Sequence, residues 1–137
     1  MTLNRGFGYI FGAVYVLVGA VGFAITSGVE FAATEGKNLL FFEVNPLHNI
    51  IHLAVGALLI GGAAAGAIMS RRVNLLVGVV YLLVGALGLF LVGNEFNILA
   101  LNHPDNGLHF ATALLAIAVS TAESARGAPR GSMAAQS

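Results

Sequence analysis

Three histidines and one aspartate, in two short polar stretches, are the residues of this chain best suited to chemistry. His48 and His52 are four residues apart, and so are Asp105 and His109. Residues four apart share one face of an α-helix, so each pair can bind the same ion. Three imidazoles and one carboxylate match the ligands of zinc or another divalent transition metal. His52 and His109 could instead be the two axial ligands of a haem held between helices.

Asparagines accompany both pairs. Asn45 and Asn49 lie beside the first pair, and Asn102 and Asn106 beside the second. Hydrogen-bonded to ring nitrogens, the amides of Asn49 and Asn106 would fix the orientation of ligating imidazoles. A structural interpretation is also open, because polar side chains in the first turn of a helix satisfy its free N–H groups and bond across helices. The stretches therefore predict a metal or haem site, a structural polar network, or groups that handle a proton or a solute.

The two stretches repeat one pattern. Shifting the sequence by 57 residues places Asn45, Asn49 and His52 on Asn102, Asn106 and His109. Upstream of each stretch, the apolar segment 12–22 recurs as segment 78–88, with a tyrosine at the same place in each copy. These two matches predict that the chain consists of two tandem helical hairpins.

Glycines mark the expected contact faces of these hairpins. Gly12 and Gly19 are seven residues apart, as are Gly78 and Gly85 in the second copy. Small residues let helices in a membrane approach closely, so these four glycines are predicted to pack against neighbouring helices. Tyr15 and Tyr81 are predicted to be buried tyrosines that hydrogen-bond across the helices.

Composition indicates an integral membrane protein. Of the 137 residues, 58% are hydrophobic and 9% charged, whereas a soluble domain carries about 25% charged residues. Four uncharged gaps of 24, 27, 22 and 17 residues separate the charged positions, and about 20 apolar residues span a bilayer. We expect an all-α domain over residues 1–122 with spans at about 6–27, 46–70, 73–93 and 105–122. Residues 123–137 are expected to form a disordered cytoplasmic tail.

The basic residues predict the orientation. Most of them fall on one side of the expected spans and Lys37 on the other; the former are Arg5, Arg71, Arg72, Arg126 and Arg130. The positive-inside rule then places both termini and an Arg71-Arg72 turn in the cytoplasm, in a multi-pass protein of the inner (plasma) membrane. Two spans per repeat imply a pseudo-two-fold axis along the membrane normal, with both polar stretches at the outer ends of the second and fourth helices.

Several function classes are disfavoured. A net charge of +0 gives no indication of nucleic-acid binding. The absence of cysteine excludes metal sites with thiolate ligands. Nucleotide-binding and hydrolase motifs are missing, and no charged residue is committed to the middle of a span. An enzyme is therefore not favoured, although the question stays open. The expected partners are the lipid bilayer and the protein itself or another membrane protein.

The stretch N-P-x-H-N-x-x-H-L at 45–53, its echo N-x-x-H-F-A at 106–111 and the duplicated G-x-x-Y-x-x-x-G helices resemble a known family. It is an uncharacterised bacterial, mostly actinobacterial, family of four-helix membrane proteins catalogued as a domain of unknown function. The resemblance covers about residues 6–122 and implies the fold and location, but no activity or cofactor. We therefore expect a structural or accessory membrane protein acting through helix contacts, with metal or haem binding as the alternative.

Overall fold

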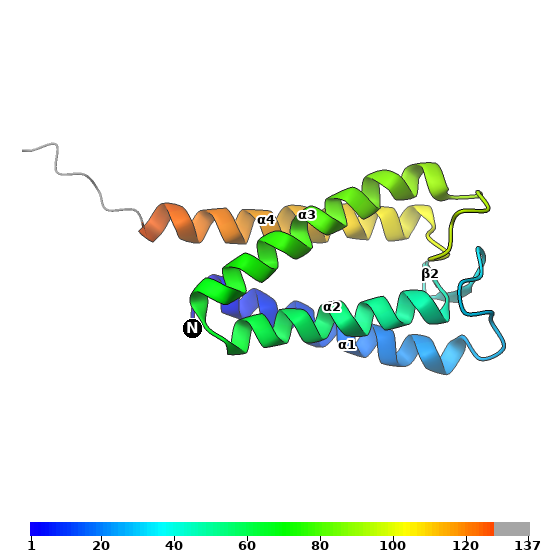
Figure 1. Cartoon of the computed structure of the whole chain (residues 1–137), viewed down its shortest axis with the longest axis horizontal. Helices are drawn as coiled ribbons and strands as arrows, with labels where there is room; N and C mark the ends of the chain where they lie inside the picture. The colour runs from blue at the N-terminus through cyan, green and yellow to red at the C-terminus, as the bar shows by residue number, and fades with distance from the viewer. Residues whose placement is uncertain (128–137) are drawn as a thin grey trace, which may run out of the picture.

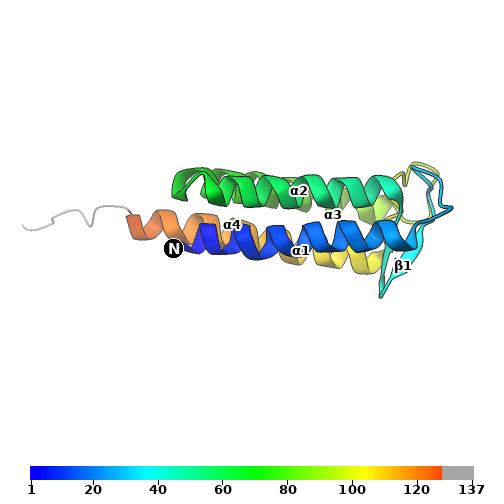
Figure 2. The ribbon, with the colours of Figure 1, turned by 90° about the horizontal axis from the view of Figure 1, so that it is seen from below.

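A computed structural model of the protein describes residues 1–127, with side chains through residue 122. These residues form four helices and one two-stranded sheet: α1 (Leu3–Ile25), β1 (Lys37–Leu39), β2 (Phe42–Val44), α2 (Pro46–Ala64), α3 (Ala67–Leu91) and α4 (His103–Gly127). The helices lie side by side, α1 chiefly against α2 and α3 chiefly against α4 (Figures 1 and 2). Both α2 and α4 begin at the end of the molecule that carries the strands.

Polar side chains define where the helices begin. The Asn45 side chain accepts a 2.8 Å hydrogen bond from the backbone N–H of His48, and Pro46 occupies the first turn, where its missing N–H costs nothing. In the same way the Asn102 side chain accepts from the backbone N–H of Asp105 at 2.9 Å. These caps set the rotational phase of α2 and α4, and with it the direction in which the histidines point.

Glycines allow the two helices of each hairpin to come together. A Cβ added at Gly12 would lie 2.9 Å from the carbonyl oxygen of Gly56 in α2, and one at Gly78 would lie 3.1 Å from that of Ala113 in α4. At Gly19 the nearest atom is the Asn49 carbonyl oxygen at 2.8 Å. Gly85 faces the ring of Phe110 at 3.3 Å. All four glycines thus lie against the partner helix of their own hairpin.

The distribution of polarity is that of a protein in lipid. Large apolar side chains are exposed along the helices, including Ile10, Leu17, Leu83, Phe90 and Leu114. Among the buried residues, polar side chains outnumber apolar ones. Among the described residues, α1, α2 and α3 are long and apolar enough to cross a membrane. Lipid replaces water around such helices, so the apolar surface faces outward and the polar groups bond inside.

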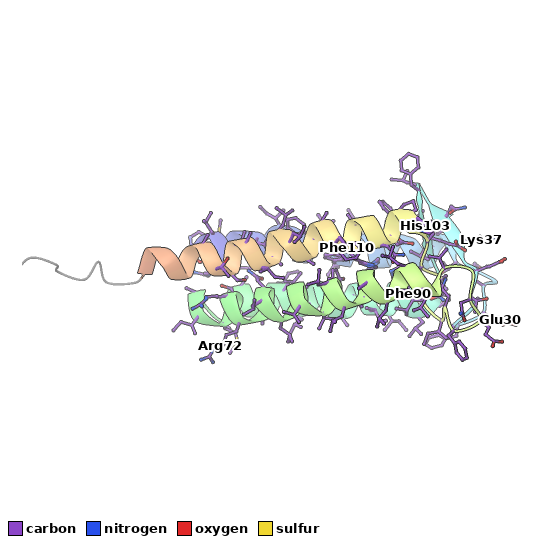
Figure 3. All side chains as sticks on the ribbon, turned by 90° about the horizontal axis from the view of Figure 1, so that it is seen from above. Glu30, Lys37, Arg72, Phe90, His103 and Phe110 are labelled. Atoms are coloured by element: carbon purple, nitrogen blue, oxygen red, sulfur yellow. The ribbon has the colours of Figure 1, made fainter. Side chains whose placement is uncertain are left out.

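The turn between α2 and α3 lies earlier than the sequence suggested. It falls at Ala65-Gly66, and Arg71 and Arg72 belong to the first turns of α3 instead of forming the turn themselves. Gly66 has φ +117°, a conformation that residues with a Cβ rarely adopt, so the chain reverses there. Arg72 nevertheless lies at the opposite end of the molecule from Glu30 and Lys37 (Figure 3).

The expectation of an all-α chain needs one correction. Residues 37–44, expected to be loop, form the antiparallel pair β1–β2, in which Lys37 faces Val44 and Leu39 faces Phe42. The chain reverses at Leu40, which has φ +60°. Neither leucine nor phenylalanine is a residue type that favours turns. A hairpin of three-residue strands gives little sequence signal, which is why this segment read as a loop.

The last helix also extends past the predicted end of the domain. The backbone of α4 stays helical to Gly127, whereas a disordered tail was expected from residue 123. Residues 108–126 contain neither glycine nor proline, so nothing in this stretch stops the helix. The rest of the expected tail, residues 128–137, lies outside the described residues.

Candidate metal centre

The second helix supplies two of the candidate ligands. His48 lies in its first turn and His52 one turn later, so both rings leave the same face of α2. Their ring centroids are 4.4 Å apart, and the two residues are 2% and 5% exposed. The first turn of α2 therefore places two imidazoles in the interior of the protein.

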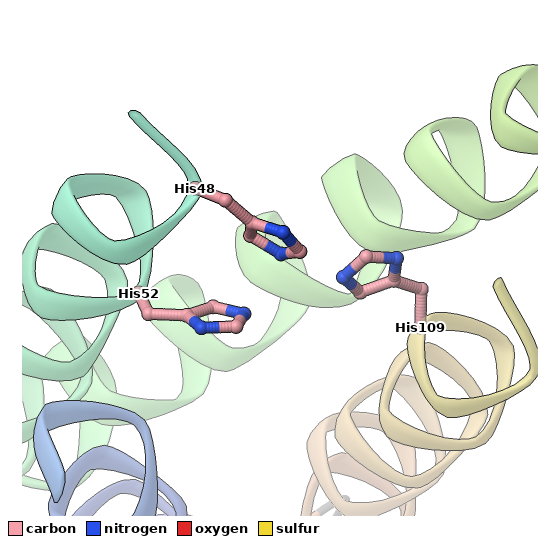
Figure 4. A group of neighbouring side chains, drawn as sticks. All are labelled: His48, His52 and His109. Carbon is pink, nitrogen blue, oxygen red and sulfur yellow. The ribbon is translucent and has the colours of Figure 1, made fainter. Parts of the chain in front are cut away.

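The fourth helix brings the third candidate ligand to the same point. His109 lies in the second turn of α4, which runs parallel to α2, and its ring centroid is 6.1 Å from that of His48. Figure 4 shows the three rings pointing toward one another from the two helices. One ligand atom from each of His48, His52 and His109 lies within 4.8 Å of the other two. Residues 57 or more positions apart in the sequence thus form one cluster.

Two tyrosines complete a closed circle of rings. The Tyr15 ring of α1 lies 5.3 Å from His52, and the Tyr81 ring of α3 lies 5.0 Å from His109, centroid to centroid. The two tyrosines are 5.5 Å apart in an edge-on arrangement. The Tyr15 hydroxyl donates to Thr112 Oγ1 of α4 at 3.1 Å, so it bonds from one hairpin to the other. All four helices therefore contribute to the surroundings of the histidines.

One ring nitrogen of each histidine in this cluster lacks a hydrogen bond. Nδ1 of His48, of His52 and of His109 is buried and has no hydrogen-bond partner among the residues that the structure describes. A buried polar atom without a partner costs free energy, and three of them in one cluster need an explanation. A bound ion that accepts the lone pairs of converging imidazoles is the explanation with the best chemical fit.

The fourth predicted ligand lies elsewhere. Asp105 is buried, but its Oδ2 accepts from the backbone N–H of Asn102 at 3.0 Å and from that of Glu43 at 3.1 Å. The carboxylate is held at the start of α4, where free N–H groups and the positive end of the helix dipole favour it. The structure therefore brings together three of the four predicted ligands and directs Asp105 toward β2.

Two of the four predicted asparagines, Asn45 and Asn102, hold the backbone around the site. Asn45 donates to the carbonyl oxygens of Ala33 at 2.7 Å and Ile98 at 2.8 Å. Asn102 donates to that of Phe41 at 2.9 Å. These two residues thus tie the starts of α2 and α4 to the loops at that end of the molecule, in addition to capping the helices.

Asn49 and Asn106 lie one helical turn after those caps, and each packs against a glycine of the partner helix. Asn49 lies against Gly22 and donates to Thr26 Oγ1 at 3.1 Å, while Asn106 lies against Gly88. No hydrogen bond joins either amide to a histidine ring in the described part of the chain. Contrary to the expectation, neither amide therefore orients an imidazole, and the Asn106 amide packs against Gly88 without a hydrogen bond to any described residue.

The site is compatible with a metal ion in size. Metal–imidazole nitrogen bonds of 2.0–2.1 Å place ligating nitrogens roughly 3.5 Å apart, whereas the candidate ligand atoms lie within 4.8 Å of one another. No pair would therefore have to close by more than about 1.3 Å to bind one ion. A haem fits less well, because the five rings contact one another around the circle and leave no flat slot for a porphyrin between His52 and His109.

Some polar residues that matter to the fold were not identified from the sequence. At the other end of the helices, Asn74 donates to Asn4 Oδ1 at 2.9 Å and Asn4 donates to the Val119 carbonyl oxygen at 3.3 Å. Arg5 Nε donates to the Ala63 carbonyl oxygen at 2.8 Å. The signal for this second polar cluster was present, because Asn74 is isolated in an otherwise apolar run. Thr112, the partner of Tyr15, had no comparable signal.

Equivalent contacts recur in the two hairpins. Shifts of 66 residues between α1 and α3 and of 57 residues between α2 and α4 relate the pairs that follow. They are Tyr15–His52 and Tyr81–His109, Gly22–Asn49 and Gly88–Asn106, Gly12–Gly56 and Gly78–Ala113, and Arg5–Ala63 and Arg71–Ser120. Residues that match in the sequence thus make matching contacts.

Long apolar helices around a polar interior define the class, which is that of a small helical membrane protein. The chain belongs to the family described as Domain of unknown function (DUF4383), whose model matches residues 5–122. That range contains every residue of the histidine cluster. Searches of curated proteins and of solved structures found no match to the chain.

Proposed function

We propose that this protein is a metal-binding four-helix bundle that crosses the membrane four times. It consists of two tandem αα-hairpins related by a pseudo-two-fold axis along the membrane normal. The recurring contacts of the two hairpins support the duplication, and the parallel course of α2 and α4 supports an axis along the helices (Figure 1). Helix α4 is the proposed fourth span because it packs along α3 over a similar length.

The proposed orientation places the protein in the inner (plasma) membrane with both termini in the cytoplasm. Arg5, Arg71 and Arg72 lie near one end of the helices and Lys37 at the other, as the positive-inside rule requires. The histidine cluster then lies near the outer leaflet. Reporter fusions after Lys37 and Asn97 should read as outside and a fusion after Arg72 as inside. A fusion after Arg72 that reports the outer side would show that the proposed orientation is wrong.

The function that the geometry supports best is the binding of one transition-metal ion by His48, His52 and His109. The observation that carries it is the convergence of three buried imidazoles whose Nδ1 atoms all lack a partner. Imidazole nitrogens are favoured ligands of zinc, copper, nickel and iron. Ligands from both hairpins, on α2 and α4, make the ion a link between the two halves of the protein.

Metal analysis of the purified chain tests this proposal. Detergent-purified protein is loaded with Zn²⁺ or with copper, passed through a desalting column and analysed for metal per chain. We expect one ion per wild-type chain and none in His52→Ala. The matched control is His103→Ala, because His103 is exposed at the start of α4 and lies outside the cluster. Equal metal content in all three proteins would refute the site.

A second candidate, a structural or accessory role, is favoured by the Asn49 and Asn106 contacts. Both amides pack against a glycine at a helix contact, and Asn49 also donates to Thr26 at the end of α1, as expected of polar side chains that stabilise helix contacts in a membrane protein. In this role the protein acts through helix contacts with another copy or with another membrane protein. Cross-linking in intact membranes tests it, because a protein without such contacts would give only monomers.

A further inference from the structure

The charge of the ligand set constrains which ion the three histidines can hold. All three ligands are neutral imidazoles when they bind a metal, and the chain has no cysteine to supply a thiolate. The one buried carboxylate among the described side chains, that of Asp105, bonds to backbone N–H groups of Asn102 and Glu43. No ligand in the cluster therefore neutralises the ion directly.

The surroundings penalise a high charge further. His48, His52 and His109 are 2–5% exposed, so an ion at the cluster is removed from water. The electrostatic cost of this transfer scales with the square of the charge, so it is roughly fourfold larger for a divalent than for a monovalent ion of similar size. Helices α2 and α4 both begin beside the cluster, and their N-terminal ends carry partial positive charge.

A single buried carboxylate offsets one positive charge. Asp105 is the one acidic residue among the buried residues whose side chains the structure describes, and it lies one helical turn from His109. With a monovalent ion at the cluster, the ion and this carboxylate sum to zero. A divalent ion would leave one unit of positive charge in a medium of low dielectric.

The number of ligands leads to the same conclusion. Zinc in proteins almost always takes four ligands, with water as the fourth in open sites. Here the side of the cluster opposite His48 is closed by the rings of Tyr15 and Tyr81. Three nitrogen ligands without a fourth suit a monovalent ion with a filled d shell, for which a trigonal arrangement is stable.

We infer that the cluster of His48, His52 and His109 binds a monovalent soft cation, Cu⁺, in preference to a divalent ion. This inference rests on the proposed function, since it specifies the ion of that same site. It involves binding alone, so no oxidant or reductant is consumed by the protein. Ag⁺ has the same charge and a filled d shell, and serves as a probe that does not change oxidation state.

Competition for the ion tests the inference on the whole chain in detergent. Cu⁺, kept reduced with ascorbate without oxygen, is divided between the protein and bicinchoninate, and Zn²⁺ between the protein and a zinc-chelating dye. We expect one equivalent of Cu⁺ or Ag⁺ to bind, with affinity at least about 100-fold above that for Zn²⁺. Zn²⁺ bound more tightly than Cu⁺ overturns this inference and leaves the metal site intact. Binding of neither metal overturns the proposed function itself.

A charge-adding variant sharpens the test. His48→Asp gives α2 the residue that the equivalent position of α4 already has, and it replaces a neutral imidazole beside the ion with a negative charge. We expect the preference for Cu⁺ over Zn²⁺ to fall at least about 10-fold in His48→Asp and to stay unchanged in the control His103→Ala. An unchanged preference in His48→Asp would contradict the charge argument.

X-ray absorption of the Cu⁺-loaded wild type provides a measurement that needs no variant. Three nitrogen ligands at about 2.0 Å are expected from the cluster. A spectrum with four ligands, or with sulfur from one of the methionines, would overturn the assignment. This measurement keeps the inference testable where a substituted chain fails to fold.

Discussion

The first hairpin, α1–α2, and the second, α3–α4, differ at one pair of equivalent positions beside the candidate site. His48 and Asp105 both lie four residues before the histidine that the hairpins share, at His52 and His109. In the first hairpin this position supplies a ring to the interior. In the second it supplies a carboxylate that binds the backbone of Asn102 and of β2. The residue type at this one position thus separates a candidate ligand from a residue that holds the strand β2 against α4.

The largest expected effect is on metal binding by His48→Ala. Removing one of three ligands should weaken the affinity for the ion at least about 100-fold. Asp105→Ala keeps all three ligands and removes only the compensating charge, so it should weaken the affinity less, by about 10-fold, and keep one equivalent of metal per chain. The measurement is the chelator competition described above, carried out on both variants. Loss of the metal in Asp105→Ala alone would reverse the assigned roles of the two positions.

A smaller effect, on stability, should distinguish the glycine contacts of the hairpins. A Cβ at Gly19 would meet a backbone carbonyl at 2.8 Å, which cannot move without shifting α2, whereas one at Gly85 would meet the Phe110 ring at 3.3 Å. Gly19→Ala should therefore cost about 2–3 kcal/mol of unfolding free energy and Gly85→Ala less than about 1 kcal/mol.

Unfolding in mixed micelles, followed by circular dichroism, measures this difference. Gly61→Ala is the control, because nothing lies within 4 Å of a Cβ at that position. Since alanine favours helix over glycine, this control should be neutral or slightly stabilising. Equal losses of unfolding free energy in Gly19→Ala and Gly85→Ala would show that the α1–α2 and α3–α4 interfaces accommodate an added methyl group equally well.

Asp105→Ala should itself destabilise the protein by about 1–2 kcal/mol. It leaves the backbone N–H groups of Asn102 and Glu43 without their acceptor at the start of α4 and in β2. The same unfolding measurement applies, with Asp105→Asn as the variant that keeps an acceptor oxygen. A loss in Asp105→Asn as large as in Asp105→Ala would mean that the charge matters and the acceptor does not.

The smallest expected effect concerns the arginines at the opposite end. Arg5 Nε donates to the Ala63 carbonyl oxygen at 2.8 Å and Arg71 Nε to the Ser120 carbonyl oxygen at 3.2 Å, near the ends of their partner helices. Arg5→Met and Arg71→Met should each cost less than about 1 kcal/mol, since water can replace these donors at the surface. A large loss in only one of them would identify a difference between the hairpins that the contacts do not suggest.

Sequence reasoning succeeded where a periodic pattern carried the information. Helical spacing placed His48 and His52 on one face, and the repeat related His52 to His109, so their convergence could be anticipated. The direction of Asp105 could not, because its spacing from His109 is equally compatible with a ligand. Its position was decided by N–H groups of Asn102 and Glu43, and the latter comes from a segment 62 residues away.

The features that sequence reasoning misplaced are all local reversals or ends. The turn at Gly66 was assigned to Arg71-Arg72 because charge was used as the boundary, whereas backbone conformation decides where a chain reverses. The hairpin at Leu40 has no glycine or asparagine in its turn, and the extension of α4 to Gly127 follows from the absence of a helix breaker. The hydropathy of the sequence identifies the helices, but it does not determine the residues at which they end.

The bond from Tyr15 to Thr112 joins residues 97 positions apart, and it bears on how the chain assembles. Each hairpin can form from neighbouring segments as it emerges into the bilayer, but the histidine cluster exists only after the two hairpins have docked. An ion held there therefore binds the docked state alone and shifts the docking equilibrium toward it. At a free ion concentration one hundred times the dissociation constant, the shift amounts to about 2.7 kcal/mol. Metal supply would then set the fraction of the protein in which the two hairpins are docked.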